Sequence, residues 1–214
     1  GVALCRREGL DFVLAVGGGS VIDSAKAIAM GAATGRDPWE FASTGTRPDK
    51  TLPVATVLTL AASGSETSNS CVLTNEETQE KRGITSETNR PVISFLDPEN
   101  TFTVSKFQTG CGIVDIMMHT LERYLTPEGG ESDLTDRIAE GLLIATRDAG
   151  RRAIANPRDY EARATLMWAG SVSHNDYTGC GRKRLFPVHK LEHELSAFRD
   201  EIAHGAGLSV LFPA

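Results

Sequence analysis

The first hundred residues alternate short apolar runs with helical or loop segments. Residues 11–16 form a compact apolar run that stops at three glycines, and residues 53–58 form a second run of similar length. Short runs bounded in this way favour buried strands over helices. Shorter strand candidates lie at 71–74 and 92–96.

The segment after the first apolar run has helical spacing. Its apolar side chains recur three and four residues apart, at Val21, Ile22, Ala25, Ile28 and Ala29. Ser20 is placed to cap the start of this helix, because a serine oxygen can accept from the free N–H groups of a first turn. Strands that alternate with a helix predict an α/β layer with mostly parallel pairing.

From about residue 103 the chain loses its strand pattern and becomes helical. Apolar residues at helical spacing predict amphipathic helices within residues 113–124, 138–146, 162–169 and 189–198. Breaks that carry Gly, Pro or Asn separate them, at 127–130, 156–157 and 179–181. We therefore expect a partial α/β domain over residues 1–103 and a partial all-α domain over residues 104–214.

Composition narrows the class of protein. Lys and Arg number 22 against 28 Asp and Glu, a net charge of −6. This acidic balance argues against a nucleic-acid partner, which a basic face would attract. With no apolar stretch of about 18 residues, we also expect no membrane partner. The four cysteines are scattered and the start lacks a secretory signal, so we expect a cytoplasmic protein with reduced thiols.

Two segments suggest a ligand crevice. Gly17-Gly18-Gly19-Ser20 lies between the first strand and the helix, where glycines and free N–H groups suit a diphosphate. The alternative is a tight turn that uses glycine for steric reasons, because the segment is neither G-x-G-x-x-G nor a Walker loop. Residues 58–66, small and hydroxylated, follow the second strand and suit the same crevice, or form a loop that bonds only to itself. The loop contains no G-x-S-x-G, so a hydrolase is not indicated.

The histidines give a stronger signal. Asp115 and His119 stand four apart on one predicted helix, and His189 and His193 repeat that spacing on another, with His204 following; only His174 falls outside this set. Residues four apart share one face of a helix. Several histidines with one carboxylate compose a catalytic divalent-metal site, and these ligands suit Fe(II) or Zn(II) rather than Ca²⁺ or Mg²⁺.

These motifs, in this order, resemble the iron-containing (group III) alcohol dehydrogenases. The matching segments are 17–26, Ser63-Gly64-Ser65-Glu66, Gly112 to His119, and His189 to Gly205. The resemblance is nearest to the butanol dehydrogenase and aldehyde reductase branch. It implies a Rossmann-like, dehydroquinate-synthase-like nucleotide-binding domain followed by a helical metal-binding catalytic domain.

The resemblance also implies roles for single residues. Asp115, His119, His189 and His204 match the metal ligands. His193 matches a histidine near the substrate, assigned to proton transfer or pocket shape. The cofactor-binding positions are Gly18, Gly19 and Ser20 for the diphosphate, Asp23 in the same motif, Thr59, Leu60 and Ser63 for the phosphates and nicotinamide side, and Lys81 for the ribose.

The implied activity is hydride transfer between NAD(P)(H) and a small alcohol or aldehyde, with NADP(H) expected over NAD(H), in a homo-oligomer (dimer or larger). Two alternatives stay open: a non-catalytic fragment, and a related metal-dependent enzyme of the glycerol dehydrogenase type. The chain departs from the family pattern in two ways. Both ends look cut, and the opening βα unit that carries the NAD or NADP choice is absent. The stretch from His193 to His204 is also one residue longer than the pattern.

Overall fold

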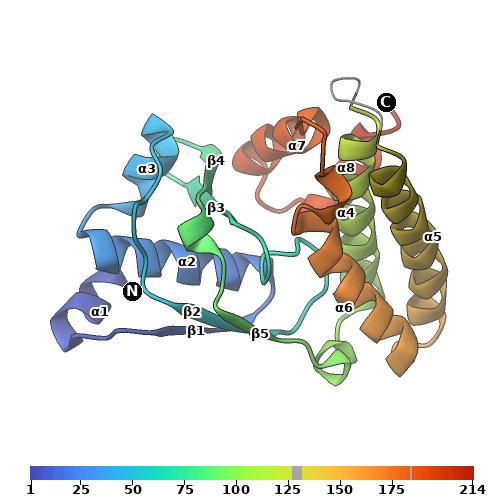
Figure 1. The fold of residues 1–214 in the computed structure, drawn as a ribbon, viewed down its shortest axis with the longest axis horizontal. Helices are drawn as coiled ribbons and strands as arrows, with labels where there is room; N and C mark the ends of the chain where they lie inside the picture. The colour runs from blue at the N-terminus through green and yellow to red at the C-terminus, as the bar shows by residue number, and fades with distance from the viewer. Residues whose placement is uncertain (127–131, 184) are drawn as a thin grey trace.

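The computed structural model describes residues 1–126, 132–183 and 185–214. Figure 1 shows two parts side by side, a small sheet with its helices and a group of longer helices. The first part runs to β5 (Ile93–Phe95), and the second begins at α4 (Lys106–Tyr124). The break that the sequence predicts at 127–130 lies outside the described residues.

Three strands form the parallel sheet, in the order β1 (Val13–Gly17), β2 (Val54–Leu58), β5. These three predicted strands and their parallel pairing are confirmed. Gly17 pairs with Leu58, so β1 and β2 end side by side and their following loops share one edge of the sheet. Ligand crevices in open α/β sheets lie at such an edge.

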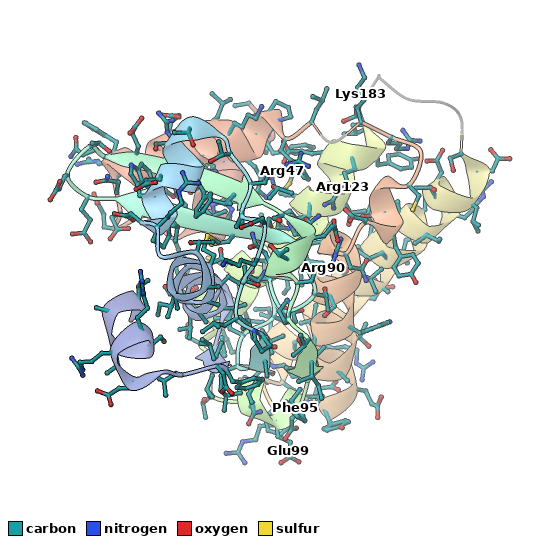
Figure 2. All side chains as sticks on the ribbon, turned by 60° about the vertical axis from the view of Figure 1, so that its left-hand side comes forward. Arg47, Arg90, Phe95, Glu99, Arg123 and Lys183 are labelled. Carbon is teal, nitrogen blue, oxygen red and sulfur yellow. The ribbon has the colours of Figure 1, made fainter. Side chains whose placement is uncertain are left out.

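Helix α2 (Gly19–Thr34) covers one face of this sheet. Its apolar side chains pack against inward-facing residues of β1 and β2, in a cluster that includes Ile22, Ala25, Ala29, Ala15, Val54 and Leu58. On the other face Leu14 and Val16 are 55% and 57% exposed, and Phe95 of β5, labelled in Figure 2, is 52% exposed. The prediction of a buried first strand was therefore wrong for the face that carries Leu14 and Val16, because α2 covers only the opposite face.

The start of α2 differs from its prediction. Gly18 is the N-cap, in extended conformation, and its carbonyl accepts from the backbone N–H groups of Val21 and Ile22. Ser20 lies inside the first turn and is exposed, so its predicted capping role was wrong. The helix begins two residues too early for Ser20 to cap it.

A separate antiparallel hairpin stands beside the sheet, formed by β3 (Ser70–Asn75) and β4 (Glu80–Thr85). The strand predicted at 71–74 is confirmed, but it pairs outside the parallel sheet. Strand β4 escaped prediction because half of its residues are charged and only Ile84 in it is buried. Ile84 packs with Phe41 of α3 (Pro38–Thr44), a short helix whose N-terminus Asp37 caps.

The remaining elements are mostly helices. They are α1 (Val2–Glu8), α4, α5 (Asp133–Ala155), α6 (Tyr160–His174), α7 (Pro187–Phe198), α8 (His204–Leu211), and the 3₁₀ helices η1 (Glu87–Asn89), η2 (Pro98–Thr101) and η3 (Tyr177–Gly179). The four predicted helices are confirmed as α4 to α7, whereas α1, α3 and α8 were not predicted. Over the described ranges, no helix combines the length and apolarity needed to cross a membrane.

Glycines let these parts approach closely. A Cβ on Gly112 of α4 would lie 2.2 Å from the Ala61 carbonyl oxygen, and one on Gly205 of α8 would lie 2.1 Å from the Cys111 carbonyl oxygen. At the first contact the loop after β2 packs closely against α4, and at the second α8 packs closely against α4. The ligand edge of the sheet therefore adjoins the helices that carry the histidines.

Candidate metal and dinucleotide site

The glycine turn and the loop after β2 are in contact. A Cβ on Gly19 would lie 2.3 Å from Ser63 Oγ, and one on Gly18 would lie 3.3 Å from Leu60 Cβ. The Thr59 N–H donates to the Gly17 carbonyl over 3.1 Å. The structure thus brings together these predicted cofactor residues, with the start of α2 free of a side-chain cap in the part of the chain described.

Asp23, also predicted to bind the cofactor, is held by protein groups. Its Oδ1 accepts from Ser65 Oγ at 2.5 Å and its Oδ2 from the Val72 N–H at 3.0 Å. Burial raises the pKa of this carboxyl above its ordinary value, although Lys26 opposes the shift. These contacts tie α2 to β3, and a role toward a cofactor stays a prediction.

Lys26, which the sequence analysis did not single out, lies about one turn after Asp23 in α2 and is buried. Its Nζ donates to the carbonyls of Ser65, Ser68 and Ser70 at 2.7, 3.0 and 2.8 Å. Burial lowers its pKa, while Asp23 opposes the change. The signal was present in the sequence, because Lys26 lies next to Ala25 on the apolar side of the helix. This lysine fixes the loop after the Ser63-Gly64 turn.

A carboxylate and three imidazoles converge in the helical part. Asp115 of α4 is 4% exposed, and its Oδ1 lies 3.4 Å from His189 Nε2 of α7 and 3.6 Å from His204 Nε2 of α8. Donor atoms of these three residues all lie within 4.8 Å of one another. The extra residue between His193 and His204 therefore does not move His204 away.

His119 stands beside this group of three. Its Nδ1 lies 3.5 Å from the same oxygen of Asp115, and its ring stacks on His189 with centroids 4.4 Å apart. Within the described residues this Nδ1 is buried and has no hydrogen-bond partner. Burial, followed by the charges of His174 and His189, holds the pKa of His119 well below its ordinary value. A neutral imidazole with a free nitrogen is the form that binds a metal.

Charge favours the anionic form of the carboxylate. Burial alone would raise the pKa of Asp115, but the hydrogen bond to His189 and the nearby imidazoles hold it below its ordinary value. One anionic oxygen faces three imidazole nitrogens, of which His119 Nδ1 has no hydrogen-bond partner among the described residues. This donor set fits a divalent cation of the Fe(II) or Zn(II) type. Oxygen-only cations such as Ca²⁺ do not match this donor set.

His193 and Lys81 lie near the ligand cluster, His193 beside His204 and Lys81 beside Glu192. The His193 ring is 5.5 Å from that of His204, and burial, followed by the charge of Lys81, lowers the pKa of His193 to about 3. Lys81 of β4 places its Nζ 3.8 Å from Glu192 Oε2 of α7. Both residues therefore stand near the imidazoles, on the side of the α/β part.

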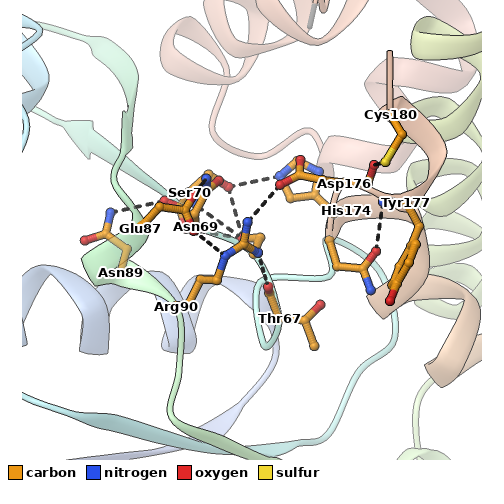
Figure 3. Close-up of polar contacts among 12 residues, drawn as sticks. Thr67, Asn69, Ser70, Glu87, Asn89, Arg90, His174, Asp176, Tyr177 and Cys180 are labelled. Carbon is orange, nitrogen blue, oxygen red and sulfur yellow. Dashed lines mark hydrogen bonds and ion pairs between the residues drawn. The ribbon is translucent and has the colours of Figure 1, made fainter. Parts of the chain in front are cut away.

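A polar network fastens the two parts together, as Figure 3 shows. Arg90 donates to the Thr67 carbonyl at 2.7 Å and to Asp176 Oδ2 at 2.8 Å, while Ser70 Oγ lies 3.0 Å from His174 Nε2. The His174 ring is also 4.3 Å from His119. The histidine outside the predicted set, His174, thus contacts a predicted ligand.

Arg123 is labelled near the centre of Figure 2 and is buried. Its Nη2 lies 3.3 Å from Nδ1 of His174.

Fold and site together define a class: an α/β nucleotide-binding layer followed by helices that carry a carboxylate and histidine cluster. The family model of iron-containing alcohol dehydrogenases matches residues 1–98, and that of the C-terminal part of the Fe-containing alcohol dehydrogenase family matches residues 109–214. The chain belongs to the iron-containing alcohol dehydrogenase family, as the motifs predict.

Known proteins of this family are similar over the whole chain. NADH-dependent butanol dehydrogenase A of Clostridium acetobutylicum is 45% identical over 213 residues, which are 100% of this chain and 54% of that protein. NADPH-dependent aldehyde reductase YqhD of Escherichia coli is 37% identical, over 100% of this chain and 55% of its own. The crystal structure of NADH-dependent butanol dehydrogenase A from Thermotoga maritima superposes with a TM-score of 0.94 at 42% identity, covering 99% of this chain and 53% of the other. The chain spans about half the length of the curated relatives it matches.

Proposed function

We propose that this chain carries the metal-binding and much of the dinucleotide-binding machinery of an alcohol dehydrogenase that interconverts a small alcohol and its aldehyde with NAD(P)(H). One observation carries the proposal: Asp115 Oδ1 lies 3.4 to 3.6 Å from imidazole nitrogens of three helices. One of these helices, α4, adjoins the loop after β2 at Gly112, and that loop contacts the glycine turn. The relatives named above support the substrate class.

The metal assignment is Asp115, His119, His189 and His204 around Fe(II) or Zn(II). When bound, such an ion supplies Lewis acidity that polarises an alcohol or carbonyl oxygen. Three of the four ligands, Asp115, His119 and His189, are buried, whereas the His204 side chain is partly exposed. The N-terminal residues 1–103 then hold the cofactor, and residues 104–214 hold the metal.

The cofactor assignment places the diphosphate at Gly18, Gly19 and Ser20, where the N-terminus of α2 favours an anion. Thr59, Leu60 and Ser63 hold the phosphates and the nicotinamide side, and Lys81 holds the ribose. Asp23 contributes by fixing the loop that begins at Ser63. We propose NADP(H) over NAD(H), although the named relatives include users of each.

His193 is the proposed proton-transfer residue. With its pKa lowered to about 3 it is uncharged near neutral pH, and a neutral imidazole can accept a hydrogen bond from a substrate hydroxyl. Its ring lies 5.5 Å from that of the proposed ligand His204, which supports this role. The remaining proposals are a cytoplasmic location and assembly as a homo-oligomer, dimer or larger.

Metal analysis of the purified protein, together with NADPH- and NADH-linked reduction of butanal, tests the function. We expect one divalent transition metal per chain and cofactor oxidation that depends on the aldehyde. His189→Ala should lose both the metal and the turnover. Metal binding without turnover would favour the non-catalytic fragment, and full activity of His189→Ala without metal would refute the ligand assignment.

A further inference from the structure

Two buried carboxylates lie directly behind two of the imidazoles. Glu122 of α4 contacts His189 Nδ1 through its Oε2, and Glu192 of α7 contacts His204 Nδ1 through its Oε2. Both glutamates are buried, with 5% and 0% exposed. The sequence pattern pointed to neither of them. Each of these rings therefore has a carboxylate on Nδ1 and Asp115 on Nε2.

Glu122 fixes both the ring of His189 and the helix that carries it. Its Oε1 accepts from the Val188 N–H at 2.6 Å and from the His189 N–H at 3.3 Å. Helix α7 starts at Pro187 and lacks a capping side chain of its own among the described residues. Glu122 thus supplies from α4 the acceptor that free N–H groups of a first helical turn require.

Glu192 is held from three sides. Its Oε1 accepts from Ser196 Oγ, its Oε2 contacts His204 Nδ1, and Lys81 Nζ stands 3.8 Å from that same oxygen. Ser196 comes from the same helix, whereas Lys81 comes from β4. The carboxylate therefore has little freedom to turn away from the His204 ring.

We propose that Glu122 and Glu192 are positioning residues that keep a proton on Nδ1 of His189 and His204 and so present Nε2 of each ring to the metal. The inference rests on the metal site of the proposed function. A carboxylate can only accept at neutral pH, so the facing nitrogen has to be the donor. The other nitrogen is then left with a lone pair for the cation, and such partners also fix the ring orientation.

Another reading of the same atoms is a second cation site, because Glu192, His193 and His204 also offer donor atoms within 4.8 Å of one another. Lys81 argues against it, since its ammonium group lies beside Glu192 Oε2 and would repel a dication. The Ser196 hydroxyl also occupies the other oxygen. Glu192 therefore serves His204 rather than a second ion.

Glu122→Gln and Glu192→Gln test the inference, with Glu194→Gln, an exposed position on α7, as the matched control. Glutamine keeps the size of the side chain but offers the ring either a weaker neutral acceptor or an N–H that opposes the Nδ1 proton. Thermal unfolding of the metal-free proteins by circular dichroism shows whether each variant folds. If Glu122→Gln does not fold, Glu192→Gln carries the test alone, because Glu192 does not cap α7.

The readouts are zinc affinity by competition with a chromophoric chelator, and the Nδ1 proton signals of the zinc-loaded protein labelled with ¹⁵N-histidine. We expect zinc binding about 10 to 100 times weaker in each glutamine variant. The Nδ1 proton signal of His189 alone should move upfield in Glu122→Gln, and that of His204 alone in Glu192→Gln. Wild-type affinity and unmoved signals in folded variants would overturn the inference, whereas absence of zinc binding by the wild-type protein would instead overturn the proposed metal site.

Discussion

The two parts of the molecule each bury a charged side chain, but these side chains differ in how well the protein supplies their hydrogen-bond partners. In the α/β part, the Lys26 ammonium group meets three carbonyls at 2.7 to 3.0 Å, so its donors are satisfied by the protein. In the helical part, the nitrogens around Asp115 stand 3.4 to 3.6 Å away, at or beyond the end of hydrogen-bond range, and His119 Nδ1 has no partner among the described residues.

The difference separates a structural network from a binding site. A buried polar group without a partner costs stability, and a bound ion is one way to complete such a group. The Lys26 network is complete and holds a loop in place. The Asp115 cluster is complete only around a cation. Substitutions in the two networks should therefore change different measured quantities.

The largest effect should follow Lys26→Met. This change leaves several buried carbonyls and the Asp23 carboxylate without their cation, and losing one member of such a buried charged network costs about 3–5 kcal/mol. We expect that loss in the free energy of unfolding, measured by urea denaturation. Lys50→Met, on an exposed lysine, should change it by less than about 0.5 kcal/mol. Equal stability of the two variants would show that the Lys26 contacts do not stabilise the fold.

Asp115→Asn should mainly change zinc affinity, whereas Lys26→Met should mainly change the free energy of unfolding. It removes the anionic oxygen that the imidazoles share, so zinc binding should weaken by at least about 100-fold, which corresponds to about 2.7 kcal/mol. Above about pH 9, where the proton on His189 no longer contributes, the free energy of unfolding of the metal-free protein should change by less than in Lys26→Met. Chelator competition and urea denaturation on the same samples measure the two quantities. Unchanged zinc affinity would remove Asp115 from the ligand set.

The sequence predicts the helices and strands that have a clear local pattern of apolar residues. Strands β1, β2 and β5 are short apolar runs, helices α4 to α7 carry apolar residues at helical spacing, and the spacing of Asp115 and His119 identifies one helix face. The sequence analysis missed β4, whose charged residues give no strand signal, and α8, whose Gly205 and Gly207 are explained only by close contacts with Cys111 and Glu192. It also missed Glu122 and Glu192, because their contacts with His189 and His204 join different helices, and no local pattern encodes such a contact. Lys26 was overlooked although its place on the apolar side of α2 is visible in the sequence.

A glycine substitution tests the contact between the turn and the loop. In Gly19→Ala the new Cβ would lie 2.3 Å from Ser63 Oγ and 3.2 Å from Ser63 Cβ, so the loop has to shift. Overpacking of this kind costs about 1–3 kcal/mol, at the low end here because a serine side chain can turn. Gly141→Ala, where a Cβ meets nothing within 4 Å on α5, should instead stabilise the protein by about 1 kcal/mol.

The same pair of variants tests dinucleotide binding. Cofactor fluorescence titration should show weaker NADPH binding for Gly19→Ala and no change for Gly141→Ala. Gly19→Ala combined with Ser63→Ala should recover part of the lost stability, because the serine oxygen is then gone. Wild-type NADPH affinity in Gly19→Ala would place the diphosphate elsewhere.

The last prediction is a pH dependence of zinc binding. Burial alone would lower the pKa of His189, but hydrogen bonds to Asp115 and Glu122 raise it to about 9 in the metal-free protein. A raised pKa means that the folded, metal-free protein holds this proton more tightly than the unfolded chain does. The resulting stability is fully present below pH 6.5 and is lost as the pH rises through about 9.

Zinc has to displace that proton from Nε2, so its affinity should increase by up to about tenfold per pH unit between pH 6.5 and 9 and then level off. Calorimetric titration in two buffers of different ionisation enthalpy should detect the released proton. Zinc binding to Glu122→Gln near pH 8 should release a smaller fraction of a proton than zinc binding to the wild-type protein. The reason is that the variant lacks one of the two carboxylates that hold the proton on His189. A zinc affinity independent of pH over this range would show that His189 is already neutral before the metal binds.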